Sequence, residues 1–393
     1  MKFLDYIQVN PTIKLEKDKQ YPFVEMANAD VFAREPKQID IKKYSSGVKF
    51  QRGDTVIARI EPCLQNGKGF FVKNVSEGFG STEFLVFRPK DDKVTNEFLY
   101  YFMLTDYIRK SMINSMTGAT GRQRVNKDIF KSLELSLPSV EKQKRIADIF
   151  SAYDDLIENN QKQIKLLEEA AMRLYKEWFV KLRFPGYENT KIVDGVPEGW
   201  EKCNLGLYAK VKSGYAFKSS WWKHNGVPVI KIKDIQDNTV NLSQLDCVDI
   251  SNANKAIDFK VVAGDLLIAM TGATTGKIAI VPIADDMLVN QRVGKFFLGE
   301  NPIAKLPFLY STLQEANSHN WALNFANGSA QPNISPTQIE SLEILFSERF
   351  VSLYNEKMQS YFESIIKLRR LINRAQQARD KLLPKLMSGE IEV

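Results

Sequence analysis

The sequence has few of the residues that build disulfide frameworks, metal centres and histidine-based active sites. It contains three cysteines and two histidines in 393 residues. Cys63, Cys203 and Cys247 form no CxxC pair, and their odd count fits a reducing compartment better than a set of disulfides. Neither His224 nor His319 lies in a pattern typical of a catalytic triad or a metal cluster. The sequence therefore predicts neither a zinc site nor histidine catalysis.

Long apolar runs and nucleotide-binding fingerprints are also missing. The first residues have no apolar signal core and no run could cross a bilayer, so we expect a cytoplasmic protein without a membrane segment. Gly272–Lys277 resembles a phosphate-binding loop, but one residue too few separates its glycines, and Ile278 replaces the Ser or Thr that would hold magnesium. No Gly-x-Gly-x-x-Gly fingerprint occurs. We therefore expect no catalytic residues, no metal and no cofactor in this chain.

The charge is weighted towards basic residues. There are 54 Lys and Arg against 47 Asp and Glu, which gives a net charge of +7 and a pI near 9.0. With 44% hydrophobic residues the chain can bury two independent cores. A basic balance favours an anionic polymer such as nucleic acid as the partner, although many basic proteins bind none.

Two stretches, 139–180 and 347–387, carry apolar residues at alternating steps of four and three, the pattern of a coiled-coil seam. One seam needs a partner seam, and the chain contains both. Asn160 is a polar residue within the first seam; it either fixes the register of the helices or is a packing defect near Leu368. The predicted seam consists of Ile146, Phe150, Tyr153, Ile157, Asn160, Ile164 and Leu167, with Tyr361, Ile365, Leu368 and Ile372.

A shift of roughly 208 residues superposes the two seams and also aligns the sequence before each of them. Gly53–Arg59 matches Gly264–Met270, and Ile129–Leu135 matches Gln338–Ile344. The chain is therefore a tandem duplication of a globular α+β half followed by a long helix. Because a whole globular domain separates the helices, we expect them to pair antiparallel. The expected order is a first domain at 1–138, a central helix at 139–184, a linker and second domain at 185–346, and a C-terminal helix at 347–393.

Local patterns predict further elements. An amphipathic helix is expected over Asn96–Ser115, and short β-rich runs with Gly and Asn turns fill the rest of the first domain. The central helix should run to about Leu182, about 60 Å at ~1.5 Å per residue. Pro384 should bend or end the last helix, which closes at Ser388 and Gly389.

Polar, Gly-rich loops occur between strands in both halves. Arg suits guanine, Asn or Gln suits adenine, and Ser, Thr and Lys suit phosphates, which is the vocabulary of duplex DNA readout. The alternative is that such loops are ordinary turns, but their recurrence in both halves favours a binding surface. The predicted DNA-binding residues are Arg59, Asn66, Lys68, Arg122, Gln123 and Arg124 in the first half, and Lys212, Ser213, Tyr215, Lys231, Lys233, Thr271, Thr274, Thr275, Lys277, Asn290, Gln291, Arg292, Ser329 and Gln331 in the second.

Several segments resemble one family over nearly the whole chain. They are Arg122–Pro138, Leu174–Gly186, Val196–Trp200 and Leu382–Ile391. In these the sequence is similar to the specificity subunits of type I restriction-modification systems, which consist of two target recognition domains separated by two long helices. The first half departs from the pattern, since it has no evident counterpart of Trp200–Ser219.

The resemblance implies a non-catalytic subunit that reads a bipartite, interrupted and asymmetric target in double-stranded DNA. It also implies a scaffold for two methyltransferase subunits and for motor-nuclease subunits. Those partners would use S-adenosylmethionine, ATP and magnesium, whereas this chain would hold no cofactor. The long helices would then set the unread gap between the half-sites. The alternative function is a coiled-coil scaffold that binds only proteins and no DNA.

Overall fold

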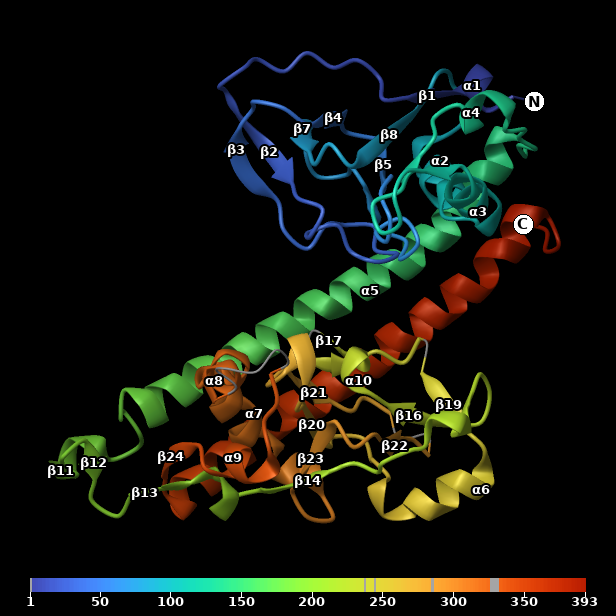
Figure 1. The fold of residues 1–393 in the computed structure, drawn as a ribbon. Helices are drawn as coiled ribbons and strands as arrows, with labels where there is room; N and C mark the ends of the chain where they lie inside the picture. The colour runs from blue at the N-terminus through green and yellow to red at the C-terminus, as the bar shows by residue number, and fades with distance from the viewer. Residues whose placement is uncertain (1, 237, 244, 284–285, 326–331) are drawn as a thin grey trace. The chain divides into compact units, whose positions relative to one another are not determined.

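A computed structural model of the chain describes residues 2–236, 238–243, 245–283, 286–325 and 332–393. The chain forms two compact units (Figure 1). Unit 1 comprises residues 1–156 and 375–393, and unit 2 comprises residues 157–374. Both are mixed α/β, and each long helix contributes residues to both units, so the predicted fold class is confirmed.

Unit 1 contains two sheets of four strands in its described part. The first has the order β1-β8-β5-β6, formed by Ile7–Val9, Phe84–Pro89, Thr55–Ala58 and Gly69–Phe71. The second has the order β3-β2-β7-β4, formed by Asp40–Lys43, Gln20–Val24, Glu77–Gly80 and Val48–Gln51.

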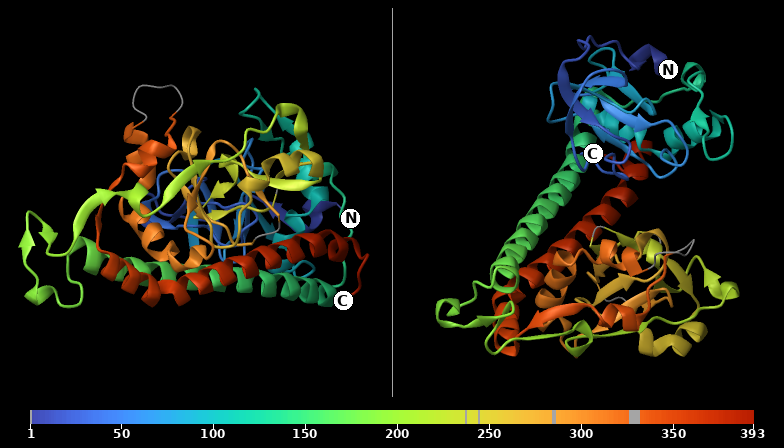
Figure 2. Two further views of the ribbon diagram at one scale, coloured as in Figure 1. Left: turned by 90° about the horizontal axis from the view of Figure 1, so that it is seen from below. Right: turned by 60° about the vertical axis from the view of Figure 1, so that its left-hand side comes forward.

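Unit 2 repeats this layout with additions. Its six-stranded sheet has the order β14-β23-β20-β21-β18-β17, formed by Lys210–Ser213, Val293–Phe297, Leu266–Ala269, Ile278–Ile280, Thr239–Val240 and Ile235–Gln236. Its four-stranded sheet has the order β15-β19-β16-β22, formed by Trp222–Lys223, Asp246–Val248, Val227–Ile230 and Leu288–Val289. A separate pair joins β13 (Glu201–Asn204) to β24 (Glu343–Phe346). A hairpin of β11 (Ile192–Val193) and β12 (Val196–Pro197) extends away from these sheets (Figure 2).

The duplication is visible in the strand pairing. The order β1-β8-β5-β6 matches β14-β23-β20-β21, and each unit has one parallel pair in its second sheet, β2 with β7 and β16 with β22. The prediction that the first half has no counterpart of Trp200–Ser219 is wrong for strand β14, because β1 of unit 1 corresponds to it. The Phe3 N–H donates to the Leu133 carbonyl at 2.9 Å, as the Leu205 N–H donates to the Leu342 carbonyl at 2.8 Å. Strand β1 therefore occupies the place of β14, although it stops earlier.

Burial in the central strands follows the alternation of a sheet covered on both faces. Val56 and Ala58 contribute to one core of unit 1, and Ile57 contributes to the other. In unit 2, Leu267 packs in one core and Ile268 in the other. Each unit therefore has separate cores on the two faces of its first sheet, which fixes the strand register and the loops at the strand ends.

The shorter helices follow the repeat only in part, since the place of the helix at Phe3–Tyr6 is taken in unit 2 by the 3-10 turn Leu205–Leu207. Unit 1 has α1 (Phe3–Tyr6), α2 (Asn96–Met103), α3 (Asp106–Asn114) and α4 (Ile129–Ser132). Unit 2 has α6 (Ile250–Ala253), α7 (Leu306–Glu315), α8 (Ser318–Phe325) and α9 (Pro336–Glu340). The single helix predicted over Asn96–Ser115 is thus wrong. Thr105 has an extended backbone, with φ −63° and ψ 149°, and this breaks the helix between α2 and α3.

The two long helices are α5 (Val140–Tyr175), green in Figure 1, and α10 (Glu348–Ser388), red in Figure 1. A π-helical turn over Lys176–Val180 ends the first helix, and Leu182 then takes a positive φ of 58°. Helix α10 does not end at Pro384, which lies within it. It stops at Ser388, before Gly389 with a φ of +77°.

Within each unit the long helices pair through apolar and polar contacts. In unit 2, Arg369 donates to Glu168 at 2.7 Å, and the Tyr354 hydroxyl donates to the Ala171 carbonyl at 2.9 Å. The later residue of α5 thus contacts the earlier residue of α10, so the two helices pack antiparallel. Asn160 is only 4% exposed, and its Nδ2 has no hydrogen-bond partner among the described residues. Its amide donor therefore makes no hydrogen bond that could fix the register.

Candidate nucleic-acid interface

Three predicted loops of unit 2 meet where β14, β20 and β22 end. Tyr215 forms a bridge with Asn290, and the Gln291 N–H donates to the Tyr215 carbonyl at 2.9 Å. The Met270 N–H donates to the carbonyl of Arg292, also at 2.9 Å. Both Gln291 and Arg292 have exposed side chains. The backbone thus presents an amide and a guanidinium side by side.

The loop that follows β20 adjoins this group. The Thr271 hydroxyl donates to the Asn333 side-chain oxygen at 2.9 Å, and the two residues form a bridge. Thr275 is fully buried, and its hydroxyl donates to the Gly272 carbonyl at 2.7 Å. We therefore correct the prediction for Thr275, because its hydroxyl shapes the loop. Thr274 donates to the backbone of a neighbouring loop, Lys277 is exposed, and Ser329 and Gln331 lie outside the described residues.

Two of the predicted lysines are held by an acidic residue. The amines of Lys231 and Lys233 lie 2.9 and 2.8 Å from one oxygen of Asp246. The hydrogen bond from Lys233, followed by the smaller effect of the hydrogen bond from Lys231, holds the pKa of the Asp246 carboxyl below its usual range. The Lys231 amine also lies 3.3 Å from the centre of the Trp222 ring. Both lysines therefore already form ion pairs with Asp246 in the free protein.

Aromatic rings and lysines lie together beside the end of β14. The rings of Tyr215 and Trp221 are nearly parallel, with an interplanar angle of 13° and centroids 6.3 Å apart. The exposed Lys212 places its amine 4.8 Å from the Phe259 ring centre. Ser213 precedes them at the end of β14, opposite Gly294. Ring faces with nearby cations suit both packing and contact with nucleic acid.

In unit 1 two of the three predicted arginines, Arg59 and Arg124, lie at one carboxylate. Arg124 donates from Nε to both oxygens of Glu83, at 3.0 and 2.9 Å, and from Nη2 to one of them at 2.7 Å. The Nε of Arg59 lies 3.7 Å from Glu83. The hydrogen bond from Arg124 is the main reason that the pKa of Glu83 lies below its ordinary value. The cluster carries two positive charges and one negative charge.

The other predicted residues of unit 1 surround this cluster. The Glu61 N–H donates to the Gln123 carbonyl at 2.9 Å, and the Glu61 carboxylate accepts from the Gly121 N–H at 3.0 Å. Lys68 donates its amine to the Met26 carbonyl at 3.1 Å. Asn66 and Arg122 have exposed side chains. Glu61 thus ties the loop 117–124 to the segment that follows β5.

Sequence reasoning missed the carboxylates Glu61, Glu83 and Asp246. Glu83 and its partner Arg124 are 41 residues apart in the chain. No periodic pattern or motif joins them, so a single sequence held no signal for this contact. An alignment of the loops of the two halves would have placed Glu83 opposite the predicted residue Arg292.

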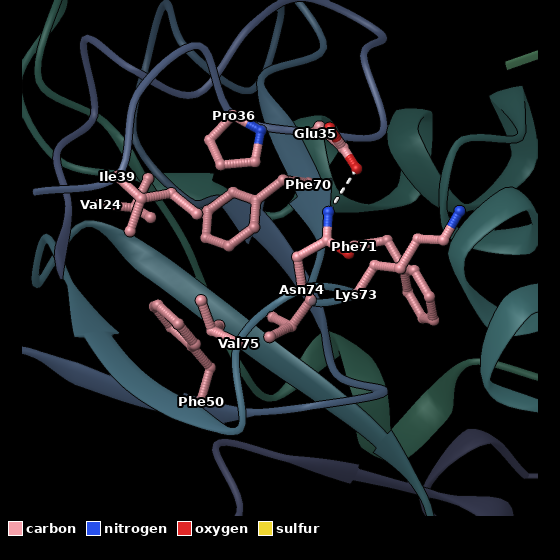
Figure 3. A pocket seen from close by; sticks show the side chains of 11 residues that line it. Val24, Glu35, Pro36, Ile39, Phe50, Phe70, Phe71, Lys73, Asn74 and Val75 are labelled. Atoms are coloured by element: carbon pink, nitrogen blue, oxygen red, sulfur yellow. Dashed lines mark hydrogen bonds between the residues drawn. The ribbon is translucent and has the colours of Figure 1, made fainter. Parts of the chain in front are cut away.

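Unit 1 also contains a small apolar cavity of about 50 Å³. Figure 3 shows the rings of Phe50 and Phe70 in its wall, near Ile39. Asn74 donates to Glu35 at 2.6 Å beside it. The cavity is small and mostly apolar, and the Asn74 amide and the Glu35 carboxylate bond to each other, so we do not include it in the interface.

Among the described residues, no group of three or more His, Cys, Asp and Glu side chains could hold a metal ion. Within the same residues, every helix is too short or too polar to span a lipid bilayer.

Comparison with protein families gives one clear match. The model of the type I restriction modification DNA specificity domain matches residues 5–169 and again residues 197–347. The two matches correspond to the two halves of the duplication.

Named relatives agree with this match. The chain is 27% identical over 327 residues to the type I restriction enzyme MjaVIII specificity subunit of Methanocaldococcus jannaschii, covering 81% of this chain and 75% of that one. It is 25% identical over 409 residues to the HindI specificity subunit of Haemophilus influenzae, covering 87% of each. Among solved structures, the S subunit of a type I restriction-modification system from M. genitalium aligns with a TM-score of 0.54 at 14% identity. That alignment covers 98% of this chain and 95% of that one.

Proposed function

The chain belongs to the family of type I restriction modification DNA specificity domains, and from this premise we propose that it is the sequence-reading subunit of a type I restriction-modification complex. The observation that carries the proposal is the repeated loop frame with different side chains. Unit 1 offers Arg59, Arg124 and Glu83, whereas unit 2 offers Gln291 and Arg292. Two similar frames with unlike side chains would read two unlike half-sites in one duplex. The target is then bipartite, interrupted and asymmetric.

Base and phosphate contacts fall to different residues in this proposal. The exposed amide of Gln291 and the guanidinium group of Arg292, which follow a strand end, suit base edges in the major groove. Lys212, Lys277 and Arg122 suit phosphates, since a cation gains there without reading sequence.

The long helices would set the distance between the half-sites. Helix α5 has 36 residues, about 54 Å at ~1.5 Å per residue, against ~34 Å for one turn of DNA. We infer recognition domains at 1–138 and 185–346, with helices at 139–184 and 347–393 between them. The charged faces of the helices would then receive two methyltransferase subunits and motor-nuclease subunits. Those partners would supply S-adenosylmethionine, ATP, magnesium and all catalysis.

The test is to produce the chain with its methyltransferase partner in a host that lacks other methylation, and to map methylated sites. The expected map has two short half-sites separated by a fixed number of unread base pairs. Methylation that did not depend on this chain, or that showed no shared sequence, would contradict the proposal. Salt-insensitive partner binding with no retention of DNA would instead support a protein scaffold.

A further inference from the structure

Residues 81–83 of unit 1 lie in the same backbone frame as residues 290–292 of unit 2. The frame consists of main-chain hydrogen bonds that recur at matching positions in both units. In unit 1 the Ser81 N–H donates to the Val24 carbonyl and the Phe84 N–H to the Ser81 carbonyl, both at 3.2 Å. The Arg59 N–H donates to the Glu83 carbonyl at 2.8 Å, and the Val125 N–H donates to the Arg59 carbonyl at 2.9 Å. In unit 2 the Asn290 N–H donates to the Ile230 carbonyl at 3.0 Å, and the Val293 N–H donates to the Asn290 carbonyl at 2.9 Å. The Met270 N–H donates to the Arg292 carbonyl and the Ile334 N–H to the Met270 carbonyl, both at 2.9 Å.

Even the side chain that shapes the turn is matched. The Ser81 hydroxyl oxygen accepts from the Glu83 N–H at 3.2 Å. The Asn290 side-chain oxygen accepts from the Arg292 N–H at 3.3 Å. Each triplet therefore begins with a residue that caps its own turn. The middle residues, Thr82 and Gln291, are both exposed.

The neighbours of the triplets correspond as well. Ile60 bridges Arg124 in unit 1 as Thr271 bridges Asn333 in unit 2. The carbonyl oxygens of Lys68 and Lys277 accept from equivalent alanines in the two units, at 3.0 and 2.8 Å. Lysine thus recurs at one position of the frame, whereas the positions around the triplets differ.

The charge differs at all three positions, and at one of them, Glu83 against Arg292, its sign is reversed. Unit 2 has Met270, Arg292 and Asn333 where unit 1 has Arg59, Glu83 and Arg124. In unit 2 the exposed Arg292 has no ion-pair partner within the part of the chain that the structure describes. In unit 1 the acidic residue lies between two arginines. The two frames therefore present different hydrogen-bonding groups from the same backbone.

Glu83 orients one guanidinium group. It accepts from the Nε and Nη2 of Arg124, so that the remaining Nη1 donates only to the Arg122 carbonyl, at 3.3 Å. The buried Nε–H of Arg59 has no hydrogen-bond partner, although it lies 3.7 Å from Glu83. In the free protein the Arg59 Nε–H is thus unpaired, and the Arg124 Nη1 makes one hydrogen bond only.

We propose that Ser81, Thr82 and Glu83 form the base-reading loop of unit 1, in which Glu83 is the positioning residue that holds Arg124 for contact with a guanine. This inference rests on the proposed function and deepens it. A guanidinium whose Nε edge is occupied by a carboxylate can still direct its Nη1–Nη2 end at the O6 and N7 acceptors of guanine. Thr82 occupies the place of Gln291 and contacts the neighbouring position.

The test measures half-site preference with the chain assembled with its methyltransferase partner. A pool of duplexes randomised across both half-sites is bound and sequenced for the wild type and for the variants Arg124→Ala, Glu83→Gln and Thr82→Ala. We expect Arg124→Ala and Glu83→Gln to relax one guanine position of a single half-site by roughly 5- to 150-fold. The conservative variant Glu83→Asp should recover part of that preference. Replacing this guanine by 7-deazaguanine should weaken the wild type and leave Arg124→Ala unchanged.

Glu97→Gln, an exposed acidic position on α2, is the matched control for loss of charge. Thr82→Ala keeps the proposal testable if the charged variants unfold, because Thr82 is exposed. The inference is overturned if all three variants keep the wild-type preference, or if both half-sites weaken equally. A wild type without any sequence preference would overturn the proposed function itself.

Discussion

Arg379 donates from Nη1 to the Oδ1 of Asp154 at 2.7 Å, and thereby joins α10 to α5 inside unit 1. The two side chains are 9% and 3% exposed. Tyr101 donates its hydroxyl proton to the other oxygen of Asp154, also at 2.7 Å. The same Arg379 nitrogen donates to the Phe32 carbonyl at 3.0 Å. One buried pair thus links both long helices to α2 and to a loop of the first domain.

Removal of one partner of this pair should be costly. Asp154→Ala leaves the buried Arg379 guanidinium with only the half-exposed Asp380 as its counter-charge, which costs up to about 3–5 kcal/mol. We expect denaturant unfolding of the full chain to show this loss at an unchanged slope. The double variant Asp154→Leu with Arg379→Met should recover most of it. Equal losses in the single and double variants would contradict an electrostatic cause.

In unit 2, Gln291→Ala and Arg292→Ala should each alter recognition of one half-site only. The side chains are exposed, so the fold should persist, and each lost bidentate contact should cost about 1–3 kcal/mol of discrimination. Methylation maps of the assembled complex measure the effect. A change in both half-sites to the same extent would count against separate reading by the two units.

Whole heptads added to the long helices should lengthen the unread gap. Seven residues between Asn160 and Ala171, matched in α10, add about 10.5 Å, which corresponds to roughly 3 base pairs at ~3.4 Å each. Deep sequencing of methylated sites gives the gap directly. Altered half-sites with a fixed gap would refute the idea that the helices set the spacing.

Burial of Asp234 should give unit 2 a stability that depends on pH. Desolvation raises the pKa of this carboxyl from 3.8 to about 6, against the opposing effect of the Lys231 N–H. The folded state then binds more protons than the unfolded state between these values, so stability falls as pH rises from about 4 to 6. Asp234→Asn should lack this decline in denaturant midpoints, whereas the exposed Asp258→Asn should retain it. Parallel curves for wild type and Asp234→Asn would show that the carboxyl does not titrate in this range.

The sequence predicts the large features because they repeat or alternate. The match of Gly53–Arg59 with Gly264–Met270 located two equivalent buried strands, and the seam around Ile157 and Ile365 located the paired helices. The equivalence of β1 and β14 escaped because the repeat distance there is about 202 residues, so a single shift does not align them. The break at Thr105 also escaped, because the apolar spacing continues across it.

The candidate site was predictable only in part. Gln291 and Arg292 stand out as adjacent polar residues between strands, whereas Glu83 follows a Ser-Thr pair that resembles any turn. Its partner Arg124 is distant in the chain, and so is Arg379 from Asp154, at 225 residues. Such contacts depend on how strands and helices close in space, which local propensity does not encode.

The frame around residues 59, 83 and 124 is made of main-chain hydrogen bonds, and unit 2 builds it with Met, Arg and Asn at the same places. The backbone therefore tolerates exchange of the side chains that it presents. Under the proposed function, point substitutions at these positions would change the target and leave the main-chain hydrogen bonds of the frame in place. A library randomised at residues 59, 83 and 124 would then be a compact one in which to search for altered recognition.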